Sequence, residues 1–174
     1  MKKLLSIAFM LMFAATNLFA QGKMHQPKPN SERKSPHETI TGNHMKITYG
    51  RPYKKGRDIF GALEAYGKVW RAGADEATEI TVDKDCTFGG KSLKAGTYVL
   101  FATPNKTEWT IILNSKLGQW GAFDYDKNKD KDVLQVNVPA GSTKNVVEQW
   151  TITIKKDGLL MEWDKTSVFV PVKF

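Results

Sequence analysis

The sequence predicts an all-β fold: a single antiparallel β-sandwich domain with one short helix, after a signal peptide and a disordered linker. Three observations lead to this prediction. Short runs of alternating apolar and polar residues recur along the chain, and such runs are typical of half-buried strands. Turn-forming pairs such as Gly89-Gly90 and Asp157-Gly158 separate some of these runs. Helix-period patterns are scarce. A β-barrel is the second choice.

The N-terminus has the layout of a secretory signal peptide. Two lysines precede an apolar run over residues 4–13, and small residues lead to Ala20. This pattern predicts a signal peptide over residues 1–20, cut before Gln21. The apolar run is shorter than the roughly 20 residues of a transmembrane helix. We therefore expect an exported protein, periplasmic or secreted, without a membrane span.

Residues 21–36 hold three prolines, four basic residues and almost no apolar ones. A segment of this composition cannot bury enough apolar surface to fold, so it is predicted to be a disordered linker. The β-sandwich domain is expected over residues 37–174. Its single cysteine, Cys86, cannot form an internal disulfide and lies in a strand-like run. A buried structural thiol is expected there.

Alternation and turn residues place the elements of the domain. Strands are expected at residues 44–49, 78–83, 97–103, 108–114, 132–138, 146–154, 159–163 and 168–174, with a tight hairpin at 87–93. Pro171 suggests that the last strand lies at an edge. The one helix is expected after Asp58, which could cap it, and is expected to end at Gly67.

Residues 49–78 break the plain strand pattern. They combine arginines, lysines and an acidic pair with five glycines, and a polar, glycine-rich segment beside regular strands is a good place for a site. Guanidinium groups bind carboxylate, phosphate or sugar-acid oxygens, and aromatic rings could pack against a sugar. The candidate ligand-binding residues are Arg51, Lys55, Arg57, Trp70, Arg71, Asp75, Glu76, Trp120 and Tyr125. The same charges could instead pair with one another and hold the segment in place.

Five motifs carry a resemblance to a known family. In order, they read YGRPYKKGRDIFG, YGKVWRAGADEAT, GGKSLKAGTYVLF, EWTIILN and QWGAFDYD. Over roughly residues 35–174 the chain resembles a family of exported bacterial proteins, domain of unknown function 2911. The resemblance implies one exported β-rich domain without an established activity. Asp75 stands where the family often has asparagine, which puts any role for an amide there in doubt.

Several kinds of site find little support in the sequence. The three histidines lack ligand spacing for zinc, and no serine lies in a nucleophile-elbow motif. Residues 124–132 resemble a calcium loop but lack its glycine and closing glutamate, so a solvated hairpin tip is expected. The formal net charge of +8 becomes +6 without the two lysines of the signal peptide. Because the lysines are scattered and form no recognition motif, no nucleic-acid binding is expected.

The sequence thus favours an exported, non-catalytic binding module with an anionic or saccharide-like ligand. One alternative is a hydrolase of cell-envelope glycan that uses Asp75 or Glu76, although acids such as Glu64 are also present and nothing selects a pair. Another is a structural envelope protein without a small ligand. No catalytic residue, cofactor or metal is predicted, and the sequence indicates no oligomeric state.

Overall fold

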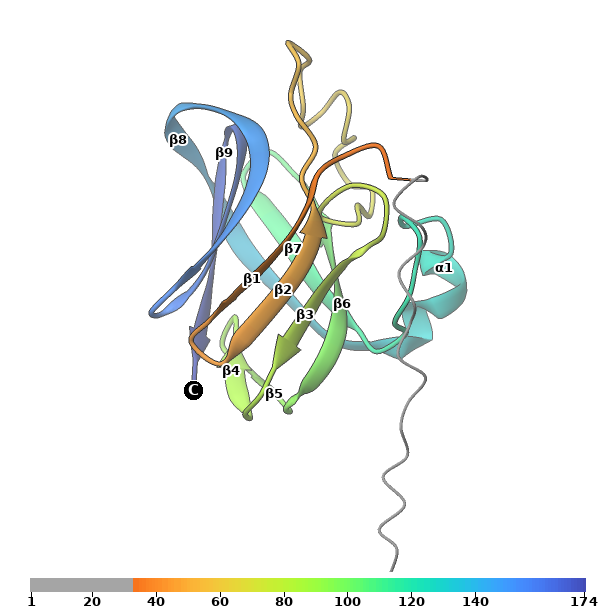
Figure 1. Ribbon diagram of the computed structural model, residues 1–174, viewed down its shortest axis with the longest axis vertical. Helices are drawn as coiled ribbons and strands as arrows, with labels where there is room; N and C mark the ends of the chain where they lie inside the picture. The colour runs from red at the N-terminus through yellow and green to blue at the C-terminus, as the bar shows by residue number, and fades with distance from the viewer. Residues whose placement is uncertain (1–32) are drawn as a thin grey trace, which may run out of the picture.

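The computed structural model describes residues 33–174, which form one antiparallel sheet of nine strands (Figure 1). The predicted signal peptide and residues 21–32 of the predicted linker lie outside these residues. The strands are β1 (His37–Gly42), β2 (Met45–Gly50), β3 (Thr78–Val82), β4 (Cys86–Phe88), β5 (Lys91–Leu93), β6 (Gly96–Thr103), β7 (Glu108–Asn114), β8 (Asp132–Lys155) and β9 (Gly158–Lys173). Their order in the sheet is β1-β2-β3-β6-β7-β8-β9-β4-β5.

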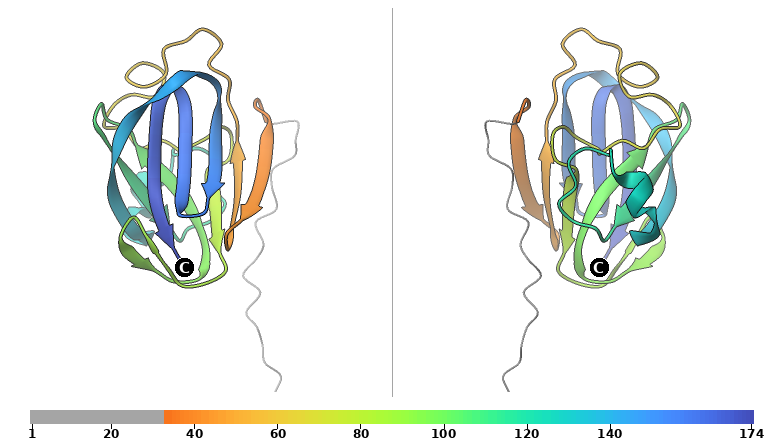
Figure 2. Two further views of the ribbon diagram at one scale, coloured as in Figure 1. Left: turned by 90° about the vertical axis from the view of Figure 1, so that its left-hand side faces the viewer. Right: turned by 90° about the vertical axis from the view of Figure 1, so that its right-hand side faces the viewer.

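The sheet bends into two facing layers. One layer holds β1, β2, β3, β6 and β7, and the hairpin of β8 and β9 faces it (Figures 1 and 2). The predicted all-β antiparallel class is confirmed, with both layers belonging to one continuous sheet. The long strand β8 connects them, because its first part pairs with β7 and its later part with β9. Its register shifts after Ser142 and again after Val147, and such irregularities bend a strand.

The first and the last strand of the chain differ from the prediction. Strand β1 was not predicted as a strand; it pairs with β2 through a turn in which Asn43 and His44 have φ angles of 41° and 59°. It is mostly polar and half-exposed, so alternation does not reveal it. The edge position predicted for the last strand is wrong, because β9 lies between β8 and β4. Pro171 is tolerated because the pairing with β8 stops at Val168.

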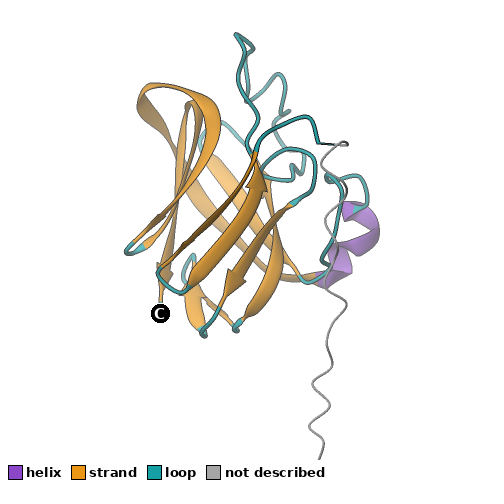
Figure 3. Ribbon diagram, viewed as in Figure 1, coloured by secondary structure: helices purple, strands orange, loops and turns teal. Residues whose placement is uncertain are grey.

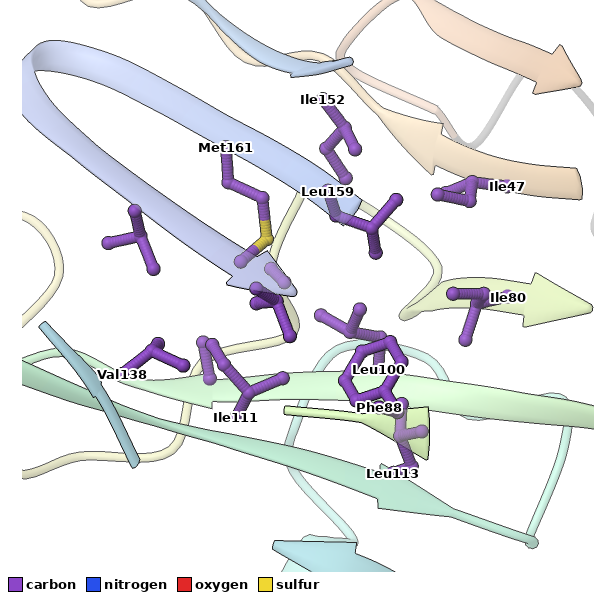
Figure 4. Packing of buried hydrophobic residues seen from close by; sticks show 14 of the residues in the cluster. Ile47, Ile80, Phe88, Leu100, Ile111, Leu113, Val138, Ile152, Leu159 and Met161 are labelled. Carbon is purple, nitrogen blue, oxygen red and sulfur yellow. The ribbon is translucent and has the colours of Figure 1, made fainter. Parts of the chain in front are cut away.

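The core fills the space between the layers. Ile152, Leu159 and Met161 come from the hairpin of β8 and β9 and face apolar side chains of the other layer (Figure 4). Four tryptophans belong to the same core: Trp70, Trp109, Trp150 and Trp163, each at most 3% exposed. Trp70 and Trp150 have ring centroids 4.7 Å apart in an edge-to-face arrangement, a favoured geometry for aromatic pairs. Cys86 is a buried free thiol, as expected.

A second apolar cluster covers the outer face of the first layer. Val99, Phe101 and Ile112 are buried there, and Tyr125 packs against them. Tyr125 begins helix α1 (Tyr125–Asn128), which runs into the 3-10 helix η2 (Lys129–Lys131) (Figure 3). These helices replace the hairpin tip expected at residues 124–132. Strand β6 is buried on both faces, which explains its almost continuous apolar sequence.

The helix predicted after Asp58 does not form. The backbone there makes a series of turns, with Gly61 at φ = 91° and Gly67 at φ = 72°. A right-handed helix cannot pass through a residue with positive φ, so Gly61 stops it near its start. Among the described residues, no helix has the length and apolar character needed to cross a membrane.

Candidate functional site

The segment between β2 and β3 forms turns and loops at one end of the two layers (Figure 3). Isolated bridges fasten it to both layers: Tyr53 pairs with Gln149 of β8, and Trp70 pairs with Ala102 of β6. A third bridge joins Glu76 to Trp120. The segment is therefore irregular in backbone but fixed at several points.

Unusual backbone conformations gather in this segment. Lys55, Ala72 and Asp75 have φ angles of 50°, 50° and 64°. Residues other than glycine rarely adopt positive φ, and such strained positions cluster at binding and active sites. The backbone thus supports the choice of this segment as the place to look for a site.

The two ends of the segment are in close backbone contact. Gly50, at the end of β2, lies so near Ala74 that a Cβ atom at Gly50 would overlap the Ala74 carbonyl oxygen. A Cβ atom at Gly73 would lie 3.0 Å from the Gly50 carbonyl oxygen. Only glycine permits this approach of two backbones. Gly73 and Ala74 also line the cavity that the segment encloses.

This cavity, the Arg71 cavity, has a volume of about 330 Å³, near the lower end of the range for small-molecule sites. It carries more positive than negative charge: its charged lining residues are Lys34, Lys55, Arg57, Glu64, Arg71 and Asp75. Tyr53, Leu63 and Trp163 add apolar surface. Four of the predicted site residues therefore lie in one cavity, namely Lys55, Arg57, Arg71 and Asp75.

The Arg71 side chain makes no hydrogen bond or ion pair within residues 33–174. Its Nε atom is buried and makes no hydrogen bond within residues 33–174. Leaving a buried donor unsatisfied costs about 1–3 kcal/mol. A guanidinium group offers several donors in a planar fork that fits carboxylate or phosphate oxygens. An anion in the cavity would supply the acceptor that the described chain does not.

Arg57 and Lys55 add charge beside Arg71. The Arg57 guanidinium donates to the carbonyl oxygens of Lys54 at 2.9 Å and Tyr53 at 2.5 Å. These bonds fix its position, and within residues 33–174 the Arg57 guanidinium makes no ion pair with a carboxylate. The backbone N–H of Lys55 donates to Glu148 Oε1 at 2.8 Å. Both side chains are exposed at the cavity, where they raise the local positive potential.

Glu64 is the acidic group of the cavity that sequence reasoning did not single out. Its carboxyl group makes no ion pair or side-chain hydrogen bond in the described part of the chain. Burial raises its pKa from 4.5 to about 7, although the positive charges of Arg71 and Arg57 act to lower it. A half-buried carboxyl group with a displaced pKa is characteristic of functional sites. No local sequence signal marks it, because Glu64 lies within the region predicted as a helix.

Asp75 holds the chain that enters the domain. Its two carboxylate oxygens accept hydrogen bonds from the backbone N–H of Lys34, each at 3.1 Å, and Oδ2 accepts one from Ser35 at 3.1 Å. Asp75 is only 8% exposed. Residues 33–36, the end of the predicted linker, are thus placed against the segment. This carboxylate has a structural role.

Glu76 lies beside a separate cavity of about 140 Å³. Arg33 reaches it with Nε at 3.0 Å and a terminal nitrogen at 2.9 Å, and His37 Nε2 lies 3.0 Å away. Burial raises the pKa of Glu76, but the hydrogen bond from Arg33, with the charges of Arg33 and His37, outweighs burial and lowers it. Glu76 therefore pairs with Arg33 and His37 at the start of the domain. It lies outside the Arg71 cavity.

Arg51 lies between the two layers. Its Nε donates to the Trp150 carbonyl oxygen at 3.2 Å, and a terminal nitrogen donates to the Thr151 hydroxyl at 3.0 Å. The other terminal nitrogen lies 2.9 Å from Glu38. Since Glu38 belongs to β1 and Trp150 to β8, Arg51 joins the two layers. It does not line the Arg71 cavity.

The three predicted aromatic contacts lie elsewhere. Trp70 is buried in the core, where its Nε1 donates to the Gly73 carbonyl oxygen at 3.1 Å. Trp120 pairs with Glu76, and Tyr125 donates from its hydroxyl to Asp132 at 2.7 Å. Burial and the neighbouring Asp132 raise the pKa of Tyr125. Within residues 33–174, no group of three or more His, Cys, Asp or Glu side chains could hold a metal ion.

The fold and cavity define a small all-β domain with one irregular, glycine-rich segment that encloses a positively charged cavity at one end. The chain belongs to the family Protein of unknown function (DUF2911), whose model matches residues 31–172. This match confirms the resemblance and includes every residue that lines the cavity. No curated protein and no solved structure is significantly similar to this chain.

Proposed function

We propose that the protein is an exported, non-catalytic binding module that holds an anionic ligand in the Arg71 cavity. The observation that carries this proposal is the buried Arg71 Nε, which has no hydrogen-bond acceptor within residues 33–174. A donor of this kind suits a bound carboxylate or phosphate, since a charge-assisted hydrogen bond is stronger than a neutral one.

The charges around Arg71 support the same ligand class. Among the described residues, Lys34, Lys55 and Arg57 line the cavity with it, and Glu64 and Asp75 are the acids there. The Asp75 oxygens already accept backbone N–H groups. The cavity therefore retains an excess of positive charge, and such a concave site attracts anions.

Calorimetric titration of the purified protein with glucuronate, N-acetylmuramate and glucose 6-phosphate tests this proposal, with glucose as the neutral comparison. We expect at least one anion to bind and Arg71→Ala to weaken it at least about 10-fold, the loss expected for a hydrogen bond to a charged group. Lys91→Ala removes an exposed charge from β5, away from the cavity, and serves as the control. The proposal fails if no anion binds, or if Arg71→Ala binds as tightly as the wild type.

The alternatives expected from the sequence have weaker support. The glycan hydrolase expected from the sequence would use Asp75 or Glu76, but Asp75 accepts backbone hydrogen bonds and Glu76 is paired with Arg33. Hydrolysis of envelope glycan that disappears in Glu76→Gln, with folding retained, would restore that alternative. A purely structural role is supported at Arg51, whose Nε and both terminal nitrogens have partners, and at Asp75, which binds the backbone of Lys34 and Ser35.

Export rests on residues 1–20 of the sequence. Fusion of these residues to a reporter enzyme that is active only outside the cytoplasm tests it. We expect activity from the fusion and none when Leu4 and Leu5 are both replaced by arginine, because the apolar run is then interrupted. A fusion that stays inactive would remove export from the proposal.

A further inference from the structure

Arg71 and Glu64 line the same cavity but do not bond to each other. Within residues 33–174, neither side chain makes an ion pair or a side-chain hydrogen bond. They are close enough for the Arg71 charge to act on the Glu64 carboxyl group. An anion held by Arg71 would therefore have an unused acceptor beside it.

We propose that Glu64 determines specificity: it accepts a hydrogen bond from a hydroxyl group of the ligand while Arg71 binds the anionic group. The cavity then selects hydroxylated anions of single-ring size, the chemistry shared by sugar acids and sugar phosphates, over anions without hydroxyl groups. This inference rests on the proposed function and names the ligand class of the same site. Glu64 touches the ligand in this proposal and takes part in no reaction.

The charge of the cavity favours a hydroxyl donor over an ammonium group. Four cationic side chains line it, against two carboxylates of which Asp75 is engaged with backbone N–H groups. A ligand ammonium would bring a further positive charge near Arg57 and Arg71 and would be repelled. A hydroxyl group can donate to Glu64 without that cost.

The size and the apolar part of the cavity fit a sugar ring. Its volume of about 330 Å³ is near the lower limit for small-molecule sites, so one ring fills it. Tyr53 and Leu63 line the cavity and are 40% and 43% exposed. An exposed tyrosine presents a flat, apolar face with a polar tip, against which the C–H face of a pyranose can pack.

The test compares two matched ligand pairs by calorimetry. The first pair is glucuronate and cyclohexanecarboxylate, and the second is glucose 6-phosphate and cyclohexyl phosphate. In each pair the anionic group is kept and the hydroxyl groups are removed. We expect the wild type to prefer the hydroxylated member of at least one pair by about 10-fold or more, because a lost partner leaves the site's polar group unpaired. The pair that shows the preference tells a sugar acid from a sugar phosphate.

Variants assign that preference to Glu64. We expect Glu64→Leu to reduce the ratio within the preferred pair to about 3-fold or less, since it removes the acceptor, and Glu64→Gln to retain part of the ratio through its amide oxygen. Glu108→Gln, an exposed position at the start of β7, is the control and should leave the ratio unchanged. Arg71→Ala should weaken both members of a pair alike.

Two failures are distinguishable. If anions bind through Arg71 but the wild type shows no preference, or Glu64→Leu keeps the full preference, this inference is wrong and the proposed function stands. If no anion binds at all, the proposed function is wrong as well. Circular dichroism and the melting temperature of Glu64→Gln establish that the variant folds.

Discussion

Arg51 and Arg71 belong to the same glycine-rich segment, yet the fold gives them opposite environments. Arg51 has acceptors for its Nε and both terminal nitrogens, from Trp150, Thr151 and Glu38. Arg71 has a buried Nε without an acceptor within residues 33–174. This difference shows that the number of arginines in a segment does not by itself define a binding site. The partners of each side chain make the difference: the end of the segment near Arg51 anchors two layers, and the Arg71 end is where we propose that a ligand binds.

The largest expected effect comes from Gly50, whose backbone contact with Ala74 joins the Arg51 end of the segment to the Arg71 end. Gly50→Ala should destabilise the protein by about 3 kcal/mol or more, because the new Cβ atom overlaps the Ala74 backbone, which cannot move as a flexible side chain would. Urea unfolding measures this. Gly56→Ala is the control: nothing lies within 4 Å of its Cβ position and φ is 72°, so only backbone strain of about 1–2 kcal/mol is expected. Equal losses of stability in the two variants would contradict the close contact between Gly50 and Ala74.

The next effect depends on pH and belongs to the Arg71 end. The pKa of Glu64 is about 7 in the folded protein and near its usual 4.5 when unfolded. Between these values the folded state keeps a proton that the unfolded state has lost, so the free energy of unfolding falls as pH rises. The decline should reach up to about 3 kcal/mol above pH 7.

Glu64→Gln should remove this decline. Melting temperatures of the wild type and Glu64→Gln should agree at about pH 3, below both pKa values, where the carboxyl group is neutral in the folded and the unfolded state. At pH 8 the variant should be the more stable of the two. A wild type whose stability does not fall between pH 5 and 8 relative to the variant would show that Glu64 titrates as an ordinary surface acid.

Removing each arginine in turn tests the comparison itself. Arg51→Ala should lower the free energy of unfolding by about 2 kcal/mol, because the Trp150 carbonyl oxygen loses its donor. The part-exposed ion pair with Glu38 adds little. Arg71→Ala should not lower the free energy of unfolding, since the side chain makes no hydrogen bond within residues 33–174 and its removal relieves the cost of an unsatisfied buried donor. Urea unfolding that gives the reverse order would overturn the division into anchor and site.

Arg57 is expected to have the smallest effect on stability. It is exposed, and within residues 33–174 its guanidinium donates to nearby carbonyl oxygens, which water can satisfy in its absence. Arg57→Ala should stay within about 0.5 kcal/mol of the wild type, while anion binding should weaken and depend less on salt. A loss of stability comparable with that of Arg51→Ala would place Arg57 with the anchor.

Much of the fold could be predicted because its signals are local. The turns at Gly89-Gly90 and Asp157-Gly158 and the alternation in β2 and β3 are readable from a few residues. The predicted helix does not form because Gly61 has a positive φ. Glycine adopts positive and negative φ about equally, so the sequence alone could not predict this conformation. The edge strand β1 lacks apolar alternation because it is half-exposed.

The site was predictable as a region but not in its detail. The segment was identified by its composition, whereas the roles within it depend on remote partners. Trp70 looked available for a sugar, but it is buried against Trp150, eighty residues away in sequence. Glu64 owes its raised pKa to burial produced by the surrounding turns. Such distant contacts leave no mark in a local pattern.

The tryptophan core also gives the molecule an optical property. Trp70, Trp109, Trp150 and Trp163 have neighbouring ring centroids between 4.7 and 6.4 Å apart, close enough for their indoles to exchange excitation energy. Trp163 also lines the Arg71 cavity. We therefore expect native fluorescence to report unfolding, and to change if the proposed ligand binds beside Trp163.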